Sequence, residues 1–197
     1  MNKTIKDITI VVPVKSKSER VKNKNLKRFG NTSLYHLKLK QLKKTKMFNK
    51  IIVSSEDQKI LDYALKKGFD VVSGDIVLIQ DADLEYDPKD YTALIKPFKN
   101  TDADVVYGSR FMGGEYVRLQ FFWHFIANKL LTFVTNIVTN LNMSDMETGY
   151  KLFKKSVIQS INIKEKSFGV EPEITIKLAK KKYIFYEVPI SYQGRSY

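Results

Sequence analysis

Apolar residues along this chain follow two patterns, short unbroken runs and longer stretches in which they recur every three or four positions. The unbroken runs predict strands over residues 8–14, 51–54 and 75–80. The three-to-four spacing predicts helices over residues 34–46 and 55–68. Strands that alternate with helices of this length imply βαβ units. The sequence therefore predicts an α/β fold, a three-layer sandwich with a mostly parallel central sheet.

A longer apolar stripe lies in Leu119–Leu141. Its apolar side chains recur at intervals of three and four: Phe122, Phe125, Ile126, Phe133, Ile137 and Leu141. Polar residues interrupt the run, so it predicts an amphipathic helix rather than a membrane span. Two interpretations remain open. The stripe packs into the core, or Trp123 and the neighbouring phenylalanines lie at a bilayer interface.

Length and composition narrow the class of protein. The chain has 197 residues, 43% of them hydrophobic, which is enough for one substantial core but short for two independent enzyme domains. We therefore expect a single domain over residues 1–197. The absence of cysteine excludes disulfides and thiolate metal sites. The polar amino terminus lacks the long apolar segment of a secretory signal, which predicts a cytoplasmic protein.

Positive charge is concentrated in the first part of the chain. Residues 1–72 contain 18 Lys and Arg and 6 Asp and Glu, a net charge of +12, whereas residues 73–197 have a net charge of +1. This difference places a compositional seam near residue 72. A basic field attracts polyanions such as nucleotides and anionic lipid headgroups, and a solvated lysine-rich surface is the alternative. Nucleic acid is disfavoured as a partner because the basic residues are not interleaved with stacking aromatics.

The segment Gly74–Pro88, GDIVLIQDADLEYDP, breaks from an apolar strand into three closely spaced carboxylates: Asp81, Asp83 and Glu85. In open α/β sheets, ligands bind at the carboxyl ends of the strands. Carboxylates at that edge are placed to hold a divalent cation, which could in turn carry a diphosphate. The alternative is that Asp81 and Asp83 only cap a turn before Pro88.

This D-A-D segment resembles the metal and nucleotide-sugar motif of family-2 glycosyltransferases. Further segments resemble landmarks of the polyprenyl-phosphate mannosyl- and glucosyltransferase branch over about residues 73–197: ADVVYGSRF (103–111), SDMETGYK (144–151), FGVEPEITIKLA (168–179) and YEVPISY (186–192). The resemblance implies a GT-A, Rossmann-like fold and sugar transfer from a nucleotide-diphosphate sugar. It also implies Mg²⁺ or Mn²⁺ held by Asp81, Asp83 and Glu85, with contact to the donor ribose as another role for Asp81.

The same resemblance implies a polyprenyl-phosphate acceptor, and with it a protein that is peripheral at the inner face of the membrane. A phosphate is anionic at neutral pH, so it needs orientation by cations more than a general base. Arg110, Arg118 and Arg195 are candidates, because the planar fork of Arg bonds two phosphate oxygens at once. A surface salt bridge is the alternative for each.

Two acidic residues complete the expected catalytic set around Asp83 and Arg110. Asp145 and Glu147 lie in the segment that resembles the acceptor-side loop, and they are candidates for a base or for positioning the acceptor. Capping of a following helix is the competing explanation for both.

The first seventy residues resemble a different family. Val11–Asn25, VVPVKSKSERVKNKN, and Ile51–Asp57, IIVSSED, are similar to the amino-terminal segment of acylneuraminate (CMP-sugar) cytidylyltransferases, a basic loop that receives CTP. The resemblance implies that this segment binds a nucleotide, through Pro13, Ser18, Arg20, Lys24 and Asn25. The V-D-D-G-S type of turn that grips the nucleoside in family-2 enzymes is not present. Glu56 and Asp57, at the analogous strand end, are candidates to replace it.

Three interpretations follow from these resemblances. The first is a metal-dependent glycosyltransferase with a nucleotide-sugar donor and a polyprenyl-phosphate acceptor. The second is a CMP-sugar cytidylyltransferase, in which Arg20 and Lys24 hold CTP while Asp81 and Asp83 bind magnesium. The third, suggested by the seam, is a truncated or recombined chain without activity. The oligomeric state is not predicted.

Overall fold

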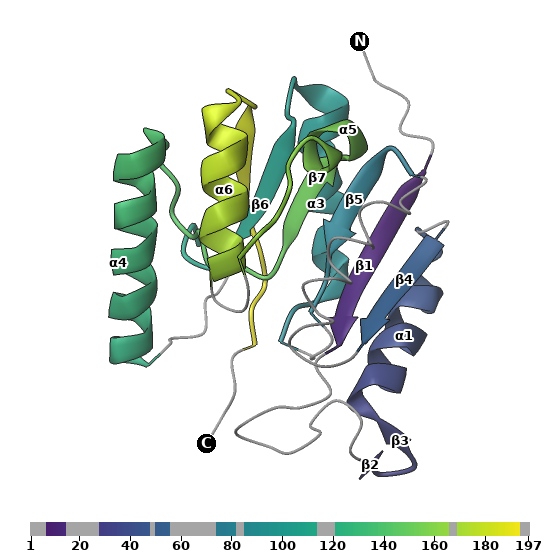
Figure 1. The fold of residues 1–197 in the computed structure, drawn as a ribbon. Coiled ribbons are helices and arrows are strands. Elements are labelled where there is room, and N and C mark those ends of the chain that lie inside the picture. Colours follow the sequence, from purple (N-terminus) through teal and green to yellow (C-terminus); the bar gives the residue numbers. More distant parts are fainter. Residues whose placement is uncertain are drawn as a thin grey trace.

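The computed structural model describes residues 7–14, 28–47, 50–55, 74–81, 85–113, 121–165 and 169–193, and a six-stranded sheet runs through its centre (Figure 1). The strands are β1 (Ile8–Val14), β4 (Lys50–Ser55), β5 (Ile76–Ile79), β6 (Val105–Ser109), β7 (Lys151–Lys154) and β8 (Phe185–Pro189). Their order across the sheet is β4-β1-β5-β7-β6-β8. All neighbouring pairs are parallel except the two that β7 makes, with β5 and with β6. The sheet is therefore mixed, and within it the predicted parallel arrangement holds for each strand but β7.

Helices cover both faces of the sheet (Figure 1). On one face lie α1 (Leu34–Thr45) and α3 (Tyr91–Asn100), and on the other lie α5 (Lys155–Gln159) and α6 (Val170–Lys180). A short 3-10 helix, η1 (Pro88–Asp90), leads into α3, and β2 (Arg28–Phe29) pairs with β3 (Thr32–Ser33) before α1. The predicted three-layer α/β architecture is confirmed.

Two apolar cores lie on the two faces of the sheet, because successive side chains of a strand point to opposite sides. The core under α1 and α3 contains Ile10, Leu42, Leu78, Leu94 and Phe98, among others. The core under α5 and α6 contains Val11, Val77, Phe153, Ile174 and Leu178, among others. The strand β5 supplies side chains to both cores, as its unbroken apolar run predicts.

The start of β5 is held against β1 by a close approach of the two backbones. A Cβ atom at Gly74 would lie 2.8 Å from the carbonyl oxygen of Asp7 and 2.9 Å from the amide nitrogen of Thr9. The amide of Asp75 donates a hydrogen bond of 2.8 Å to that same carbonyl. Only glycine fits at this position, and the contact fixes where β5 begins and therefore where its carboxyl end places Asp81.

The element boundaries agree closely with those predicted from the pattern of apolar residues. Each of β1, β4 and β5 ends within one residue of the prediction, and α1 begins at Leu34 as expected. The helix predicted within 119–141 is α4 (Phe122–Thr139). Ser55, the predicted start of the next helix, is the last residue of β4, and the rest of that predicted helix, residues 56–68, lies outside the described residues.

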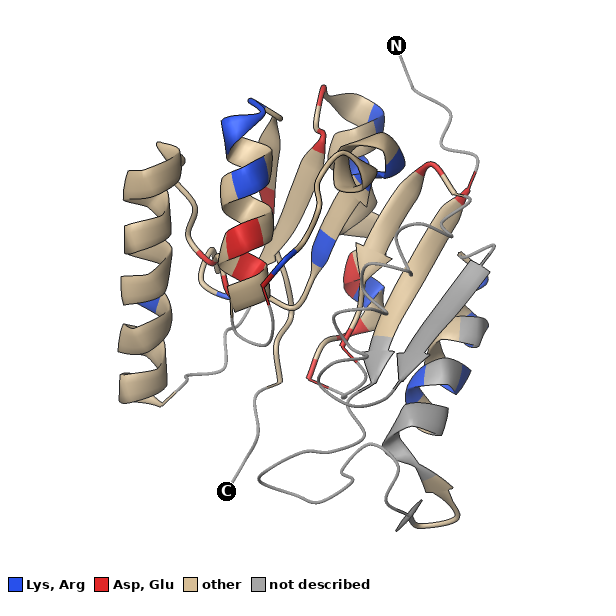
Figure 2. Ribbon diagram, in the orientation of Figure 1, with Lys and Arg blue, Asp and Glu red and all other residues tan. Residues whose placement is uncertain are grey.

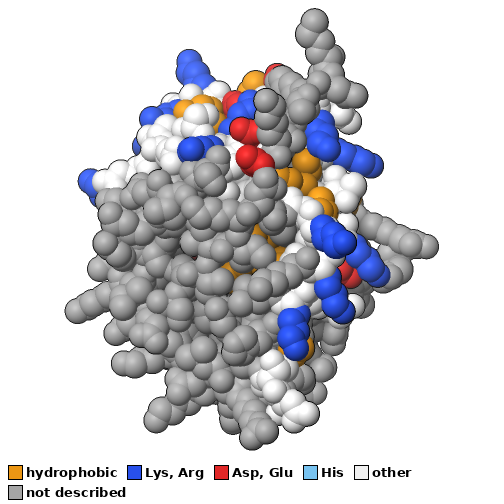
Figure 3. Space-filling model, turned by 90° about the vertical axis from the view of Figure 1, so that its right-hand side faces the viewer, with side chains coloured by type: hydrophobic (Ala, Val, Ile, Leu, Met, Phe, Trp, Pro, Cys, Tyr) orange, Lys and Arg blue, Asp and Glu red, His pale blue; other side chains and the backbone are white. Residues whose placement is uncertain are grey.

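The basic charge of the first part is carried in part by α1. Lys40 and Lys44 are exposed, and Lys and Arg side chains gather along one edge of the face seen in Figure 3. Lys38 departs from this pattern, because its side chain is buried and its Nζ donates a hydrogen bond of 3.2 Å to the carbonyl oxygen of Tyr86. One lysine of the basic segment thus reaches inward, toward the segment that follows β5.

Helix α4 lies on the outside of the molecule, against α6 (Figure 1). Its buried side chains are Thr132 and Thr135, while five of the six residues of the predicted apolar stripe are exposed: Phe122, Phe125, Ile126, Phe133 and Ile137. The sixth, Leu141, follows the helix and packs against the core under α5 and α6. The interpretation that the stripe packs into the core is therefore wrong for the five residues within α4 and holds only for Leu141. Among the described residues, no helix combines the length and the apolar character needed to cross a membrane.

Candidate active site

Chain segments of three strands meet at one edge of the sheet. Asp81 follows the carboxyl end of β5, and Arg110 follows the carboxyl end of β6. Because β7 is antiparallel to both, its amino-terminal end lies at this edge, and so does the loop 143–150 that precedes it. The reversed strand therefore brings the predicted acceptor-side loop beside the predicted metal-binding segment.

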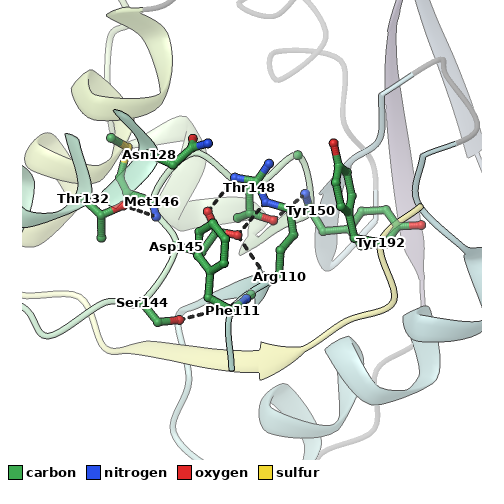
Figure 4. A network of polar contacts seen from close by, with 12 residues as sticks. Arg110, Phe111, Asn128, Thr132, Ser144, Asp145, Met146, Thr148, Tyr150 and Tyr192 are labelled. Carbon is green, nitrogen blue, oxygen red and sulfur yellow. Dashed lines mark hydrogen bonds and ion pairs between the residues drawn. The ribbon is translucent and has the colours of Figure 1, made fainter. Parts of the chain in front are cut away.

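The centre of the site is an ion pair between Arg110 and Asp145 (Figure 4). The guanidinium donates from Nε to Oδ2 and from Nη2 to Oδ1, both at 2.7 Å, and the Arg110 backbone amide donates to Oδ2 at 3.0 Å. The Arg110 side chain is 9% exposed and that of Asp145 is fully buried. The salt bridge considered as the alternative for Arg110 is therefore present, but it is bidentate and buried instead of lying at the surface.

Burial alone lowers the pKa of Arg110, but its hydrogen bonds to Asp145 outweigh that effect and raise the pKa. The guanidinium therefore stays cationic. A strand follows Asp145 and Glu147 instead of a helix, so the capping alternative for these two residues is also wrong.

The loop 143–150 is held from two sides. Glu187 of β8 accepts hydrogen bonds from the backbone amides of Ser144, at 2.8 and 3.0 Å, and of Asp145, at 3.1 Å. From the other side, polar residues of α4 bind the loop: Lys129 Nζ donates to the Ser144 carbonyl oxygen, Thr132 Oγ1 accepts from the Met146 amide, and Asn136 bonds both the amide and the carbonyl oxygen of Met143. The buried carboxylate of Asp145 is thus fixed by its backbone as well as by Arg110.

Gly149 brings the loop into contact with the end of β5. A Cβ atom at this position would lie 2.5 Å from Oδ2 of Asp81 and 2.8 Å from the ring of Tyr86. The Gly149 amide donates a hydrogen bond of 2.8 Å to the Tyr86 hydroxyl. The two sides of the site are therefore packed against each other without room for a methyl group.

Tyr192 joins the two sides a second time, from the segment after β8. Its hydroxyl donates to Oε2 of Glu85 at 2.9 Å, and its ring lies 5.3 Å from the Arg110 guanidinium carbon. Burial, and then the nearby Glu85 carboxylate, raise the pKa of Tyr192 to about 12. The phenol is therefore neutral at physiological pH and acts as a hydrogen-bond donor.

A second group of charges lies behind the loop. Lys151 is buried, its Nζ donates to the Thr148 carbonyl oxygen, and burial lowers its pKa against the opposing effect of Glu171 and Glu147. Burial, and then the Glu171 carboxylate, raise the pKa of Glu147. Oε1 of Glu147 is buried without a hydrogen-bond partner among the described residues. Glu147 is therefore a carboxyl whose protonated form is favoured by its surroundings.

The structure places five of the predicted site residues at this edge: Asp81, Glu85, Arg110, Asp145 and Glu147. Pro13 lies in β1, and nothing is described of its side chain. The remaining predictions lie outside the described residues: Ser18, Arg20, Lys24, Asn25, Glu56, Asp57, Asp83, Arg118 and Arg195.

The described carboxylates fit a divalent cation in their chemistry. Asp81 and Glu85 flank residues 82–84 at the carboxyl end of β5, and carboxylate oxygens are the ligands that Mg²⁺ and Mn²⁺ prefer. Within the ranges that the structure describes, no group of three or more acidic or histidine side chains could hold a metal. The third predicted ligand, Asp83, lies outside those ranges.

Sequence reasoning missed several residues of the site. Glu187 is a lone charge in a strand that is otherwise apolar and aromatic, and Lys151 opens a strand directly after the T-G-Y turn. A charge inside a strand is a signal for a buried partner and could have marked both. Tyr86 and Tyr192 carry no comparable signal, because tyrosine is common in strands and at their ends.

The chain belongs to glycosyl transferase family 2, whose family model matches residues 37–161, more than half of the chain. This confirms the family predicted from the D-A-D segment and the landmarks after it. The matched range begins before the predicted seam at residue 72. The likeness of residues 1–72 to cytidylyltransferases stays a prediction.

The curated relatives are named as sugar transferases, and two of the three names include dolichol phosphate or dolichyl phosphate. The low-salt glycan biosynthesis hexosyltransferase Agl6 of Haloferax volcanii is 28% identical over 151 residues, 75% of this chain and 36% of that protein. The dolichol-phosphate mannosyltransferase of Pyrococcus furiosus is 28% identical over 147 residues, 74% of this chain and 41% of that protein. A UDP-N-acetylglucosamine–dolichyl-phosphate N-acetylglucosaminyltransferase of Methanococcus voltae is 27% identical over 128 residues, 64% of this chain and 51% of that protein. The chain thus spans about a third to a half of the length of these relatives.

Solved structures show the fold. Glucosyl-3-phosphoglycerate synthase from Mycobacterium tuberculosis, in complex with UDP, has a TM-score of 0.67 at 14% identity, covering 97% of this chain and 72% of that one. The same enzyme with Mn²⁺ and UDP-glucose has a TM-score of 0.64 at 14% identity, over 96% of this chain and 72% of that one. The predicted GT-A-like fold is confirmed.

Proposed function

We propose that this protein transfers a sugar from a nucleotide-diphosphate sugar to a polyprenyl phosphate at the cytoplasmic face of a membrane. Family membership supports a glycosyltransferase, and relatives named for dolichyl phosphate support the kind of acceptor. The observation that carries the proposal is Arg110, a cation fixed by Asp145 at the edge where Asp81 and Glu85 lie. The site thus offers carboxylates for a metal and diphosphate beside a guanidinium for a second phosphate.

On the donor side, Asp81, Asp83 and Glu85 would hold Mg²⁺ or Mn²⁺. A metal bound there would stabilise the negative charge that develops on the leaving diphosphate. Solved proteins of this fold contain Mn²⁺ with UDP-glucose, which supports the kind of donor. Tyr192 orients Glu85 through its hydroxyl, and the packing of Gly149 on Asp81 limits where that carboxylate can turn.

The nucleoside would lie against the first part of the chain. We propose contacts from Pro13, Ser18, Arg20, Lys24 and Asn25, and from Glu56 and Asp57, which follow β4 in the sequence. The basic charge of residues 1–72 supports this position, since a triphosphate or diphosphate is strongly anionic.

On the acceptor side, Arg110 would orient the phosphate for attack on the sugar. A guanidinium has five N–H donors, more than its two bonds to Asp145 use. Asp145 acts as a positioning residue in this scheme, because both of its carboxylate oxygens accept from Arg110. Glu147, with its raised pKa, is the nearby group suited to exchange a proton with the acceptor. Arg118 and Arg195 are proposed as further phosphate ligands.

The first test is thermal unfolding with UDP, GDP, CDP and CTP, each with and without Mn²⁺ or Mg²⁺. A ligand at about a hundred times its Kd adds roughly 2.7 kcal/mol of stability. We expect one nucleoside diphosphate to stabilise the protein only with metal, and Asp81→Asn to abolish that shift. The control is Glu165→Gln, an exposed carboxylate before α6, which should keep it. Stabilisation by CTP alone would instead favour a cytidylyltransferase, and no shift with any nucleotide would contradict both.

The second test replaces Arg110 by Lys, which keeps the charge but not the planar fork. With the donor identified above and a short-chain polyprenyl phosphate, transfer should fall by roughly 10²-fold or more, because one point charge cannot replace the bidentate geometry. Metal-dependent binding of the nucleoside diphosphate should be unchanged. Transfer at the normal rate by Arg110→Lys would remove Arg110 from the proposed mechanism.

A further inference from the structure

Helix α4 has its apolar and polar sides reversed relative to a helix that packs on a core. Its most exposed large apolar residues are Trp123 (76%), Ile137 (66%), Phe122 (65%), Phe133 (61%) and Leu130 (60%). With about 3.6 residues per turn, these five lie on one side of the helix, opposite the buried Thr132 and Thr135. A large apolar surface exposed on one helix marks a place where the protein contacts something other than water.

The charge of this helix identifies what it contacts. Residues 119–143 contain no Asp or Glu, and Figure 2 shows α4 almost entirely in tan, the colour of uncharged residues. Its one lysine, Lys129, is turned inward to the Ser144 carbonyl oxygen and the ring of Phe111. The chain as a whole carries a net charge of +13. Residues 1–72 carry +12 of this charge, so the basic first part of the chain attracts the protein to anionic lipid, while the acid-free apolar side of α4 suits insertion into the bilayer interface.

The inward side of α4 connects this surface to the candidate active site. Lys129, Thr132 and Asn136 all bind the loop 143–150, which carries Asp145 and so fixes Arg110. Figure 4 shows Thr132 beside Met146 of this loop, and Asp145 beside Arg110. The apolar surface and the phosphate-binding side of the site are thus separated by a single helix. An acceptor whose tail lies in a bilayer would present its phosphate on that side.

We propose that the exposed side of α4 seats the protein in the interface of an anionic bilayer, with the helix parallel to the membrane plane. The explanation of why the protein would bind a membrane rests on the proposed function. Membrane binding by α4 does not itself require that the protein is catalytically active. A second copy of the chain is the competing occupant. It is disfavoured because two strongly cationic proteins repel each other, whereas anionic lipid attracts both.

The chain contains its own probe, because Trp123 is its only tryptophan. Vesicles of phosphatidylcholine with phosphatidylglycerol should shift the tryptophan emission to shorter wavelength and protect it from iodide, whereas pure phosphatidylcholine should do so more weakly. An unchanged spectrum with anionic vesicles would overturn the proposal. A shift that instead grows with protein concentration in the absence of vesicles would show that a second copy covers α4, and this too would overturn it.

Substitutions separate the surface from the rest of the protein. The double variant Leu130→Ser, Ile137→Ser should lower vesicle binding in flotation by at least about tenfold, because it removes two central apolar side chains. The matched control, Ile184→Ser, changes an exposed isoleucine outside α4 and should bind normally. Equal binding by the double variant and the control would contradict the proposal. Both variants should keep metal-dependent nucleotide stabilisation, so failure of the seating and failure of the transferase function give different results.

A different observation carries a second inference, on Glu187. Its carboxylate bonds the backbone amides of Ser144 and Asp145, while the Asp145 side chain holds Arg110. We infer that Glu187 is a positioning residue that sets the guanidinium of Arg110 through Asp145. For the role of Arg110 itself this rests on the proposed function.

The test is Glu187→Gln, with Glu173→Gln as a matched control. Glu173 likewise accepts from two backbone amides, those of Lys164 and Glu165, in the loop before α6. Glu187→Gln should speed solvent exchange of the Arg110 Nε–H, measured by NMR, by about tenfold or more and raise the acceptor KM without changing the donor KM. In an Asp145→Asn background it should add nothing. Equal effects of Glu187→Gln and Glu173→Gln, or an unchanged Arg110 signal, would overturn the inference.

Discussion

Helices α3 and α4 both carry an apolar stripe, but the two stripes face opposite environments. In α3 the stripe is buried against the sheet, with Tyr91, Leu94, Ile95 and Phe98 all in the core. In α4 the stripe is exposed, and the buried side chains are threonines. Apolar periodicity thus predicts an amphipathic helix in both cases. It does not predict whether the apolar side is buried in the core, as in α3, or exposed, as in α4.

The physical origin of the difference is in the polar residues. The polar residues Thr92, Lys96, Lys99 and Asn100 of α3 are exposed to solvent. The polar side of α4 carries Lys129, Thr132 and Asn136, whose hydrogen bonds to the loop 143–150 hold that side against the protein. Since buried polar groups must be paired, these bonds fix the rotation of α4 and leave the apolar side outward.

One substitution in each helix tests this difference between α3 and α4, and the substitution in α3 should have the larger effect on stability. Leu94→Ala in α3 should lower the free energy of unfolding by about 2–5 kcal/mol, because it leaves a cavity in the core. Leu130→Ala in α4 should change it by less than about 0.5 kcal/mol, since that side chain is exposed. Urea unfolding monitored by circular dichroism measures both. A comparable loss for Leu130→Ala would mean that the outward side of α4 is covered in solution.

An intermediate effect is expected from exchanging hydroxyl and methyl groups across α4. Thr132→Val removes the acceptor of the buried Met146 amide and should cost about 1–3 kcal/mol in the free energy of unfolding. Val134→Thr, on the outward side, makes the reverse change and should be nearly neutral. If both variants unfold at the same urea concentration, the polar side of α4 does not hold the loop.

A third and smaller effect on stability is expected at Glu147, in the loop that the inward side of α4 holds, and this effect depends on pH. Burial, followed by the Glu171 carboxylate, raises the pKa of Glu147, so the folded state favours the protonated form. Wild-type stability should therefore fall as pH rises from the unfolded pKa of about 4.3 through the raised pKa. Glu147→Gln stays neutral and should become more stable than wild type across that window, while matching it below.

Urea unfolding at a series of pH values measures this difference. The gain should be modest, because Glu147 is partly exposed and solvent screens its charge. A variant that is less stable than wild type at neutral pH would show that the Glu147 carboxylate is stabilised by a partner.

Much of the fold follows from the sequence, because it depends on local periodicity. The ends of β1, β4, β5 and α1 were predictable within a residue from the apolar runs alone. The reversal of β7 was not, since its short apolar run is compatible with either direction and only its neighbours β5 and β6 decide between them. The buried side chain of Lys38 was equally hidden, because an isolated lysine in a basic helix gives no sign that it turns inward.

The residues of the candidate site also fall into two groups, those that the sequence predicts and those that it does not. Asp81, Glu85, Arg110 and Asp145 were identified from motifs within single segments. Their partners were not, because the bond between Arg110 and Asp145 joins residues 35 positions apart and that between Glu187 and Asp145 joins residues 42 apart. Such pairings depend on the register of the sheet, which one sequence does not specify.

The missing Cβ of Gly149 has a consequence for protein engineering. The loop and the end of β5 meet there at less than a methyl group's width, so neither can be redesigned independently of the other. A library that varies residues 144–150 to change what the loop accepts would displace the Asp81 carboxylate whenever position 149 changes. Glycine at 149 should therefore be held constant together with Asp145, which fixes Arg110, while the diversity is placed at other positions of the loop.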